Sequence, residues 1–274
     1  MKRLILLCMM MLSLPAMSAS LEEAQALFAK RGENPNFALQ AADMYRSLAT
    51  QTRDQEVQAE MKLFEAQAIY FSAYKMPASP KNPKLAAFER GYEAANLAVT
   101  YFARTGNKTS EAKSLYWYGS NLGKWGETNG VLASLRKWPE LKEKTLRIRQ
   151  LDPTVYDYGA NRILGKAYLS VPFESNEEGL AFLQESFDQT LVTIPSEDMT
   201  ISRNPVNNSY LLDAYMNRNR VAQFCPLFEN FDDYLFAGEE LWSEISPDLI
   251  PETYIEQDKF EKDNELQDFY ASNC

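Results

Sequence analysis

Apolar side chains recur three and four residues apart along most of the chain, which is the spacing of one face of an α-helix. Residues 57–74 and 85–102 each show this pattern over a long run. A proline-rich connection at 76–83 separates the two runs, because proline interrupts helical hydrogen bonding. Alternation of apolar and polar residues, which marks a half-buried strand, is nearly missing. The pattern therefore predicts an all-α protein.

The stretch from Ser114 to Pro153 shows the helical pattern together with unusual glycines. Leu115, Tyr118 and Leu122 share one helical face. Four glycines lie in the same stretch: Gly119, Gly123, Gly126 and Gly130. A glycine inside a helix costs roughly 1 kcal/mol relative to alanine, so we expect a neighbouring helix, or a ligand, to approach the backbone here. A second helix is expected to end at Pro153, so the stretch predicts one helical hairpin.

Paired helices that recur at a fixed period predict a solenoid. In the tetratricopeptide pattern the first helix carries large, large, small and large residues, and Ala68, Gly119 and Gly165 fit its small position. A small residue there lets the paired helix approach closely. Three further segments match the second helix in part: 41–48, 88–95 and 183–190. Because the spacing is irregular, we predict an α-solenoid of degenerate tetratricopeptide-like helical hairpins, with a non-repetitive helical bundle as the alternative.

The first twenty residues predict a secretory signal peptide. Two basic residues precede an apolar run, Leu4–Leu14, that is too short to span a bilayer. Small residues follow, and cleavage near Ser18–Ser20 would release an exported, periplasmic chain. We then expect helical repeats over 21–196 and an acidic helical C-terminal cap over 197–274.

The charge of the chain limits its partners. Its formal net charge is -10, which excludes nucleic acid and anionic lipid as principal partners. No later apolar run is long enough for a membrane span. Fourteen acids lie between Glu229 and Asp268, against Lys259 and Lys262 alone. We interpret most of them as a solvated outer face of the cap, with a surface for a basic partner as the alternative.

Cysteine and histidine usage narrows the chemistry. Cys225 and Cys274 are the two cysteines beyond the leader, and an even pair in an exported chain predicts a disulfide. The alternative is a buried thiol at Cys225 and a frayed, free Cys274. Histidine is absent, which excludes histidine-dependent triads and histidine-ligated metals. Phosphate-loop and EF-hand spacings are missing too. We therefore expect no enzyme, no metal and no cofactor, and keep a histidine-free hydrolase as a third hypothesis.

Five residues are the candidates for ligand or partner recognition: Trp117, Tyr118, Asn121, Trp125 and Arg162. Trp117, Asn121 and Trp125 recur at every fourth residue and can follow one helical face. Aromatic rings with one amide and one guanidinium would suit an apolar pocket with a few polar anchors. The alternative is that both tryptophans pack between repeats and that Arg162 pairs with an acid such as Asp157.

Several short segments carry a family resemblance. They are LYWYG at 115–119, NLGKW at 121–125, LDP at 151–153 and YGANRILG at 158–165, with Tyr168 and Pro172. With these, the chain from about 114 to 195 resembles the T-component family of periplasmic TRAP transporters. The resemblance implies a periplasmic helical-repeat protein that partners a solute-binding protein and helps capture small organic ligands. The alternative is a cell-envelope scaffold that binds other envelope proteins without a ligand. The sequence leaves open whether the chain forms homo-oligomers.

Overall fold

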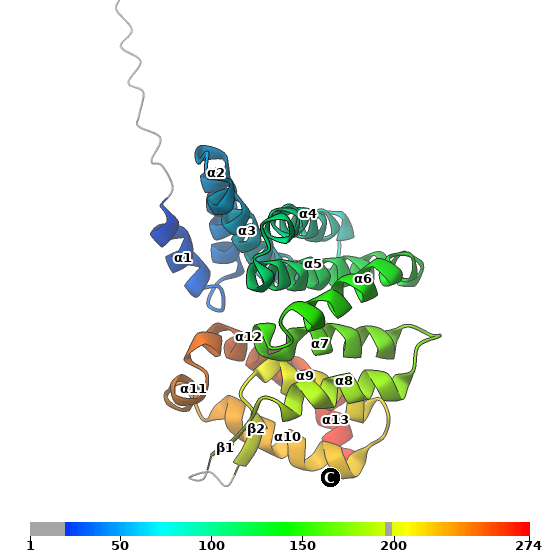
Figure 1. The fold of residues 1–274 in the computed structure, drawn as a ribbon. Coiled ribbons are helices and arrows are strands. Elements are labelled where there is room, and N and C mark those ends of the chain that lie inside the picture. The colour runs from blue at the N-terminus through cyan, green and yellow to red at the C-terminus, as the bar shows by residue number, and fades with distance from the viewer. Residues whose placement is uncertain (1–19, 195–198) are drawn as a thin grey trace, which may run out of the picture.

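A computed structural model describes residues 20–194 and 199–274. The predicted signal peptide, except for its last residue, lies outside this part of the chain. The described residues form thirteen α-helices, one 3-10 turn and one pair of short strands (Figure 1). The prediction of a mostly helical, all-α chain is confirmed. The single hairpin of strands was not predicted.

The first eight helices are α1 (Leu21–Ala29), α2 (Pro35–Gln51), α3 (Gln55–Lys75), α4 (Lys81–Thr105), α5 (Lys108–Asn129), α6 (Val131–Leu151), α7 (Val155–Ser170) and α8 (Asn176–Asp188). The later elements are β1 (Leu191–Ile194), β2 (Met199–Ser202), α9 (Pro205–Met216), α10 (Val221–Phe236), α11 (Glu239–Ile245), the 3-10 turn η2 (Pro247–Leu249), α12 (Ile250–Lys262) and α13 (Asn264–Asn273).

Local signals in the sequence set several of these boundaries. The side chain of Asp54 accepts hydrogen bonds from the backbone N–H groups of Glu56 and Val57 and so caps the start of α3. Gly106 ends α4 at a φ of 74°, in the left-handed region that glycine adopts without strain. The hairpin predicted over 114–153 is α5 and α6, joined by Gly130 at a φ of 104°.

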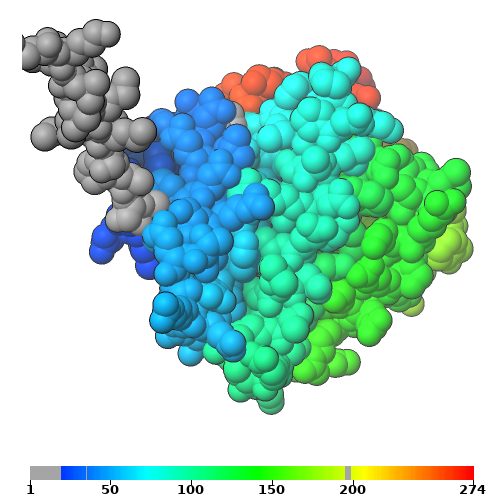
Figure 2. All heavy atoms as spheres, turned by 90° about the horizontal axis from the view of Figure 1, so that it is seen from above, coloured from blue at the N-terminus to red at the C-terminus, as the bar shows by residue number. Residues whose placement is uncertain are grey.

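Consecutive helices from α1 to α8 pack against one another, and α5 also contacts both α3 and α7. Figure 2 shows α2 to α6 following one another across one face of the molecule, from blue to green. Glycines allow several of these contacts. A Cβ on Gly119 would lie 3.2 Å from Cδ1 of Ile163 on α7, and one on Gly165 would lie 2.9 Å from the backbone oxygen of Gly179 on α8. At these two positions the glycines serve close helix packing.

The C-terminal elements form a second hydrophobic core. It joins Leu180 and Leu183 of α8 to aromatic and aliphatic residues of α9, α10, α12 and α13. Strands β1 and β2 pair antiparallel, with Leu191 opposite Ser202. The domain boundary predicted at 196/197 lies outside the described residues, between these two paired strands in sequence. Residues on both sides of that boundary therefore share one core.

The disulfide predicted between Cys225 and Cys274 is present, with the two Cα atoms 5.7 Å apart. It ties the end of α13 to α10. The same two helices pack through stacked rings, with Phe228 and Tyr270 centroids 4.1 Å apart.

Most acids of the C-terminal segment lie at least partly in solvent, as we expected, but Glu256 does not. Glu252 and Glu256 lie on the face of α12 that also carries Ile255 and Lys259, since these positions repeat at three and four residues. Glu256 is only 4% exposed. Phe260 lies about 140° around the helix axis from Ile255, and it packs in the second core. Helix α12 therefore has one face in that core and another turned toward the N-terminal helices.

Candidate functional site

A cavity of about 610 Å³ lies between the N-terminal helices and the C-terminal part of the chain. Residues of α3, α5, α6 and α7 form one side of its wall, and residues of α9, η2 and α12 form the other. Sites for small organic molecules have volumes of about 300–1,000 Å³. The cavity is therefore large enough for such a molecule.

Trp117 on α5 is the centre of an aromatic part of the wall. Its ring centroid lies 5.4 Å from that of Tyr70, 5.7 Å from Phe71, 5.0 Å from Tyr116 and 5.3 Å from Tyr156. All five residues line the cavity. Aromatic rings at these distances pack favourably in tilted or edge-to-face pairs. They give the cavity a preformed apolar surface.

Gly123, six residues further along α5, also lines the cavity. A Cβ at this position would meet no described atom within 4 Å. This differs from Gly126, where a Cβ would lie 2.9 Å from Oγ of Ser134 on the next helix. Packing of the protein explains Gly119 and Gly126 but not Gly123. We expected either a neighbouring helix or a ligand to approach the backbone at these glycines. At Gly123 no described helix does so, and the approach of a ligand is the reason that remains.

We expect Gly123→Ala to raise the free energy of unfolding by about 1 kcal/mol. Alanine removes the conformational cost of a helical glycine, and the added methyl group has free space in front of it. Urea denaturation measures the change. As a control, Gly165→Ala should be destabilising, since its Cβ would lie 2.5 Å from Cγ of Leu183. A loss of stability in Gly123→Ala would show that the helix needs glycine there for packing.

Two lysines mark a polar side of the cavity. The Nζ atoms of Lys124 on α5 and Lys259 on α12 lie 5.6 and 5.1 Å from the ring centroid of Tyr74. Each pairs with an acid on its own helix, Glu127 or Glu256, at 2.6 Å. Burial favours the neutral form of Lys259, but Glu256 and Tyr74 outweigh it, so its pKa is raised. Both cations remain charged beside an aromatic ring.

The wall of the cavity is more positive than the chain as a whole. It contains seven lysine and arginine side chains and five carboxylates, whereas the chain has a net charge of -10. Four of the cations pair with carboxylates of the same wall. Arg162 has no carboxylate partner within residues 20–194 and 199–274, although it is only 4% exposed. This charge distribution favours a ligand with hydrogen-bond acceptors or negative charge.

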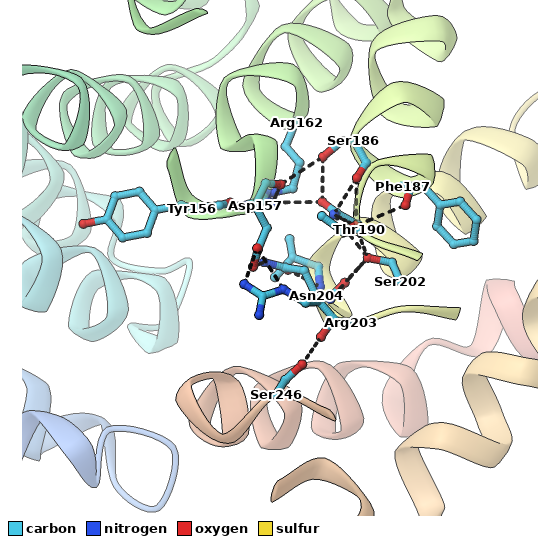
Figure 3. A network of polar contacts seen from close by, with 12 residues as sticks. Tyr156, Asp157, Arg162, Ser186, Phe187, Thr190, Ser202, Arg203, Asn204 and Ser246 are labelled. Carbon is cyan, nitrogen blue, oxygen red and sulfur yellow. Dashed lines mark hydrogen bonds and ion pairs between the residues drawn. The ribbon is translucent and has the colours of Figure 1, made fainter. Parts of the chain in front are cut away.

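The start of α7 is a strained turn beside the cavity. Tyr156, Asp157 and Tyr158 all have positive φ values, 49°, 54° and 59°. The left-handed helical conformation costs roughly 1–2 kcal/mol for each residue with a side chain, and such strain persists only where surrounding contacts hold it. The right-handed part of α7 follows from Gly159. The turn places Tyr156 in the cavity wall, and Figure 3 shows its ring extending toward the N-terminal helices.

Arg162 holds this turn from within α7. Its guanidinium donates to the backbone oxygens of Tyr156 and Asp157, at 2.7 and 2.8 Å. It also donates to Oδ1 of Asn207 at 2.8 Å and to the hydroxyl of Tyr116 at 3.2 Å. One buried cation thus connects the strained backbone to α9 and to the aromatic wall.

The side chain of Asp157 fixes the same turn from the other direction (Figure 3). Its carboxylate accepts from Nε of Arg203 and from Nδ2 of Asn204, both at 3.0 Å. The hydrogen bond of Asp157 to Arg203 holds the pKa of that arginine above its usual value. The hydroxyl of Ser186 donates to Oδ1 of Asn207 at 2.9 Å. Residues from α8 and the β2–α9 connection therefore support the turn together.

Of the five predicted recognition residues, two line the cavity: Trp117 and Arg162. Trp117 packs with other rings, as the alternative reading held, and it also faces the cavity. Arg162 contacts the backbone oxygen of Asp157, whereas the carboxylate of Asp157 pairs with Arg203. The pairing of Arg162 with an acid, which was the alternative, is therefore not found in the described chain.

The other three predicted residues lie outside the cavity wall. Asn121 is fully buried and donates to the backbone oxygens of Ala66 and Trp117. Tyr118 donates to a carboxylate oxygen of Glu140. The ring of Trp125 packs edge-on against Tyr92, with centroids 6.4 Å apart. Successive residues turn by about 100° around a helix axis, so Asn121 and Trp125 lie about 40° and 80° further round than Trp117. The three residues at every fourth position therefore do not share the cavity face.

Several wall residues carried no separate signal in the sequence. Tyr70 and Tyr74 belong to an ordinary amphipathic helix pattern, and Tyr156 follows a proline-containing turn. Lys259 lies in a segment whose acids suggested an outer surface. The spacing of apolar residues shows which faces of the helices are buried, but it does not show which of those faces lies toward α12.

No group of three or more histidine, cysteine or acidic side chains is arranged to hold a metal ion within the described ranges. The helices in those ranges include none with the length and hydropathy of a membrane span. Comparison of the sequence with protein-family models and with curated proteins finds no match.

Proposed function

We propose that the protein binds a small organic molecule in the cavity between α5, α7 and α12. The observation that carries this proposal is Gly123, a mid-helix glycine in the cavity wall with no described atom opposite it. The neighbouring aromatic wall would supply apolar contact, and the lysines beside Tyr74 would supply polar contact.

The proposal includes an α-solenoid of degenerate tetratricopeptide-like hairpins as the scaffold. The order of packing from α1 to α8 supports it, as do the small residues Gly119 and Gly165 at the closest helix contacts. The proposal also places the protein in the periplasm, where it would act as a non-enzymatic binding protein like the TRAP T-components. Its partner would then be a periplasmic solute-binding protein. This rests on the resemblance in 114–195.

Ligand binding is tested with 8-anilinonaphthalene-1-sulfonate, an aromatic anion whose fluorescence rises in apolar sites. The wild-type protein should bind it saturably. Gly123→Trp should weaken binding at least tenfold, because the indole would occupy the cavity, without lowering the melting temperature. The control is Ala103→Trp at an exposed position of α4, which should bind like the wild type. Equal binding by Gly123→Trp would overturn the proposal.

The partner is tested by capture from a periplasmic extract on the immobilised protein. Recovery of a solute-binding protein, identified by mass spectrometry, is the expected result. Recovery of envelope proteins alone, together with unchanged probe binding in Gly123→Trp, would instead support a scaffold without a ligand.

A further inference from the structure

Three lysines surround two tyrosines at one end of the cavity. The Nζ atoms of Lys124 and Lys259 lie close to the ring of Tyr74. The Nζ atom of Lys166 on α7 lies 4.8 Å from the ring centroid of Tyr210 on α9. All five residues line the cavity, and each belongs to a different helix. The fold thus gathers cations that are far apart in the sequence into one group, which we call the lysine cluster.

The hydroxyls of the two tyrosines belong to the same group. Burial would lower the pKa of Lys124 and of Lys259, but neighbouring groups outweigh it and raise both values. Tyr210 and Tyr74 are among these neighbours for each lysine. Both hydroxyls therefore lie near both ammonium groups.

The ammonium groups are accessible from the cavity. The side chains of Lys124 and Lys259 are 21% and 29% exposed, although both lie deep in the protein. Because both residues line the cavity, their exposed surface is turned toward it. An ammonium group has three N–H donors. Lys124 donates to Oε2 of Glu127 at 2.6 Å, so further donors remain for a ligand.

Positive charge exceeds negative charge where the lysine cluster meets the cavity. Its three lysines pair with Glu127, Asp213 and Glu256. The two glutamates line the cavity, whereas Asp213 lies outside its wall. Three ammonium groups and two of their carboxylate partners therefore face the space that a ligand would fill. The excess matches one singly charged acidic group, which accepts stronger hydrogen bonds from ammonium groups than a neutral acceptor does.

The lysine cluster adjoins the aromatic part of the wall. The ring of Tyr74 stacks with that of Tyr70, with centroids 6.2 Å apart. Tyr70 in turn packs against Trp117. A ligand that contacts both parts of the wall needs an acidic group next to an apolar body.

We propose that the lysine cluster binds the acidic group of an amphipathic organic acid whose apolar body lies against the aromatic wall. This rests on the proposed function of the cavity. Lys124 belongs to α5 and Lys259 to α12, so the bound acid connects the two sides of the cavity. It thereby holds α12 against the N-terminal helices.

Three naphthalene probes of similar shape test the charge that the cavity prefers: the anion 2-naphthoate, the neutral 2-naphthamide and the cation 2-naphthylmethylamine. Isothermal titration calorimetry at pH 7 measures their binding to the full chain. The wild-type protein should bind 2-naphthoate about tenfold more tightly than 2-naphthamide, which corresponds to about 1.4 kcal/mol, and the amine most weakly. Affinity for 2-naphthoate equal to or below that for 2-naphthamide would overturn the proposal.

Two variants test whether the lysine cluster causes this preference. One is Lys124→Met, and the other is Lys259→Met/Glu256→Gln, in which the second substitution avoids a buried carboxylate without its cation. Each should reduce the preference for 2-naphthoate about three- to tenfold, with binding of 2-naphthamide within twofold of the wild type. An unchanged preference in both variants would overturn the proposal.

Lys137→Met is the matched control. Lys137 also lines the cavity and pairs with an acid three residues on, Glu140, at 3.1 Å. Its Nζ atom lies beside Tyr92, outside the lysine cluster. The control should keep the preference of the wild type. An equal loss in Lys137→Met would assign the preference to the charge of the whole wall and overturn the lysine cluster as the site.

The neutral probe separates this proposal from the proposed function. Binding of 2-naphthamide without a preference for 2-naphthoate would overturn the lysine cluster and leave cavity binding intact. The variants are also titrated with 8-anilinonaphthalene-1-sulfonate, and unchanged binding in both would overturn the lysine cluster even if no other probe bound. Failure of every probe, including the naphthalenesulfonate, would overturn the lysine cluster together with the proposed function.

Discussion

Removing the disulfide between Cys225 and Cys274 is expected to lower the free energy of unfolding by about 4 kcal/mol. The bond joins residues 49 positions apart, and closing a loop of that length removes about this much conformational freedom from the unfolded chain. The closed loop contains α11, η2 and α12, so the loss should loosen the helix that forms one side of the cavity.

The measurement is urea denaturation of the wild type with and without a reducing agent, compared with the Cys225→Ala/Cys274→Ala double variant. The reduced wild type and the double variant should have similar stability. The double variant should not respond to the reducing agent. If it were as stable as the oxidised wild type, then the ring contacts between α10 and α13 would be sufficient and the disulfide would contribute little.

The second large effect is expected for Arg162→Met, which should lower the free energy of unfolding by about 4 kcal/mol. The substitution keeps an unbranched apolar side chain but removes the guanidinium from four acceptors, two of them backbone oxygens of the strained turn. Of the four, Oδ1 of Asn207 keeps its hydrogen bond from the hydroxyl of Ser186. Each buried polar group left unsatisfied costs about 1–3 kcal/mol, and water from the adjacent cavity can relieve part of this.

Arg220→Met is the matched control for that measurement. Arg220 pairs with Glu177 at 3.1 Å, with the two side chains 38% and 74% exposed. A surface pair of this kind contributes about 0–1 kcal/mol. If Arg162→Met were no more destabilising than Arg220→Met, the left-handed turn would not depend on the guanidinium. In that case contacts other than those of Arg162 would hold Tyr156 in place.

The helices could be predicted from the sequence because their causes are local. Apolar spacing predicted the helical runs that form α3 and α4, and Pro153 marked the end of α6. The disulfide followed from the number of cysteines. The short strands β1 and β2 were missed because four residues each are too few to establish an alternating pattern.

The candidate site was predicted only in part. Trp117 and Arg162 were found from residue type, and both line the cavity. Asn121 and Trp125 were chosen because they follow Trp117 at every fourth residue. That spacing turns them progressively around the helix axis, away from the face that Trp117 presents to the cavity. The sequence limited the role of Gly123 to close approach of a helix or of a ligand. The structure distinguishes it from Gly126, because a Cβ at Gly123 would meet no described atom within 4 Å.

The sequence by itself determined an acidic, histidine-free helical chain with one pair of cysteines after residue 20, since these depend on composition and on neighbours within one or two turns. The tertiary structure decided where α12 lies, which acids turn inward, and that three residues at the start of α7 are left-handed. That turn is held by Asn204 and Asn207, more than forty positions along the chain. A conformation that costs energy locally can be recognised only once the distant residues that stabilise it are in place.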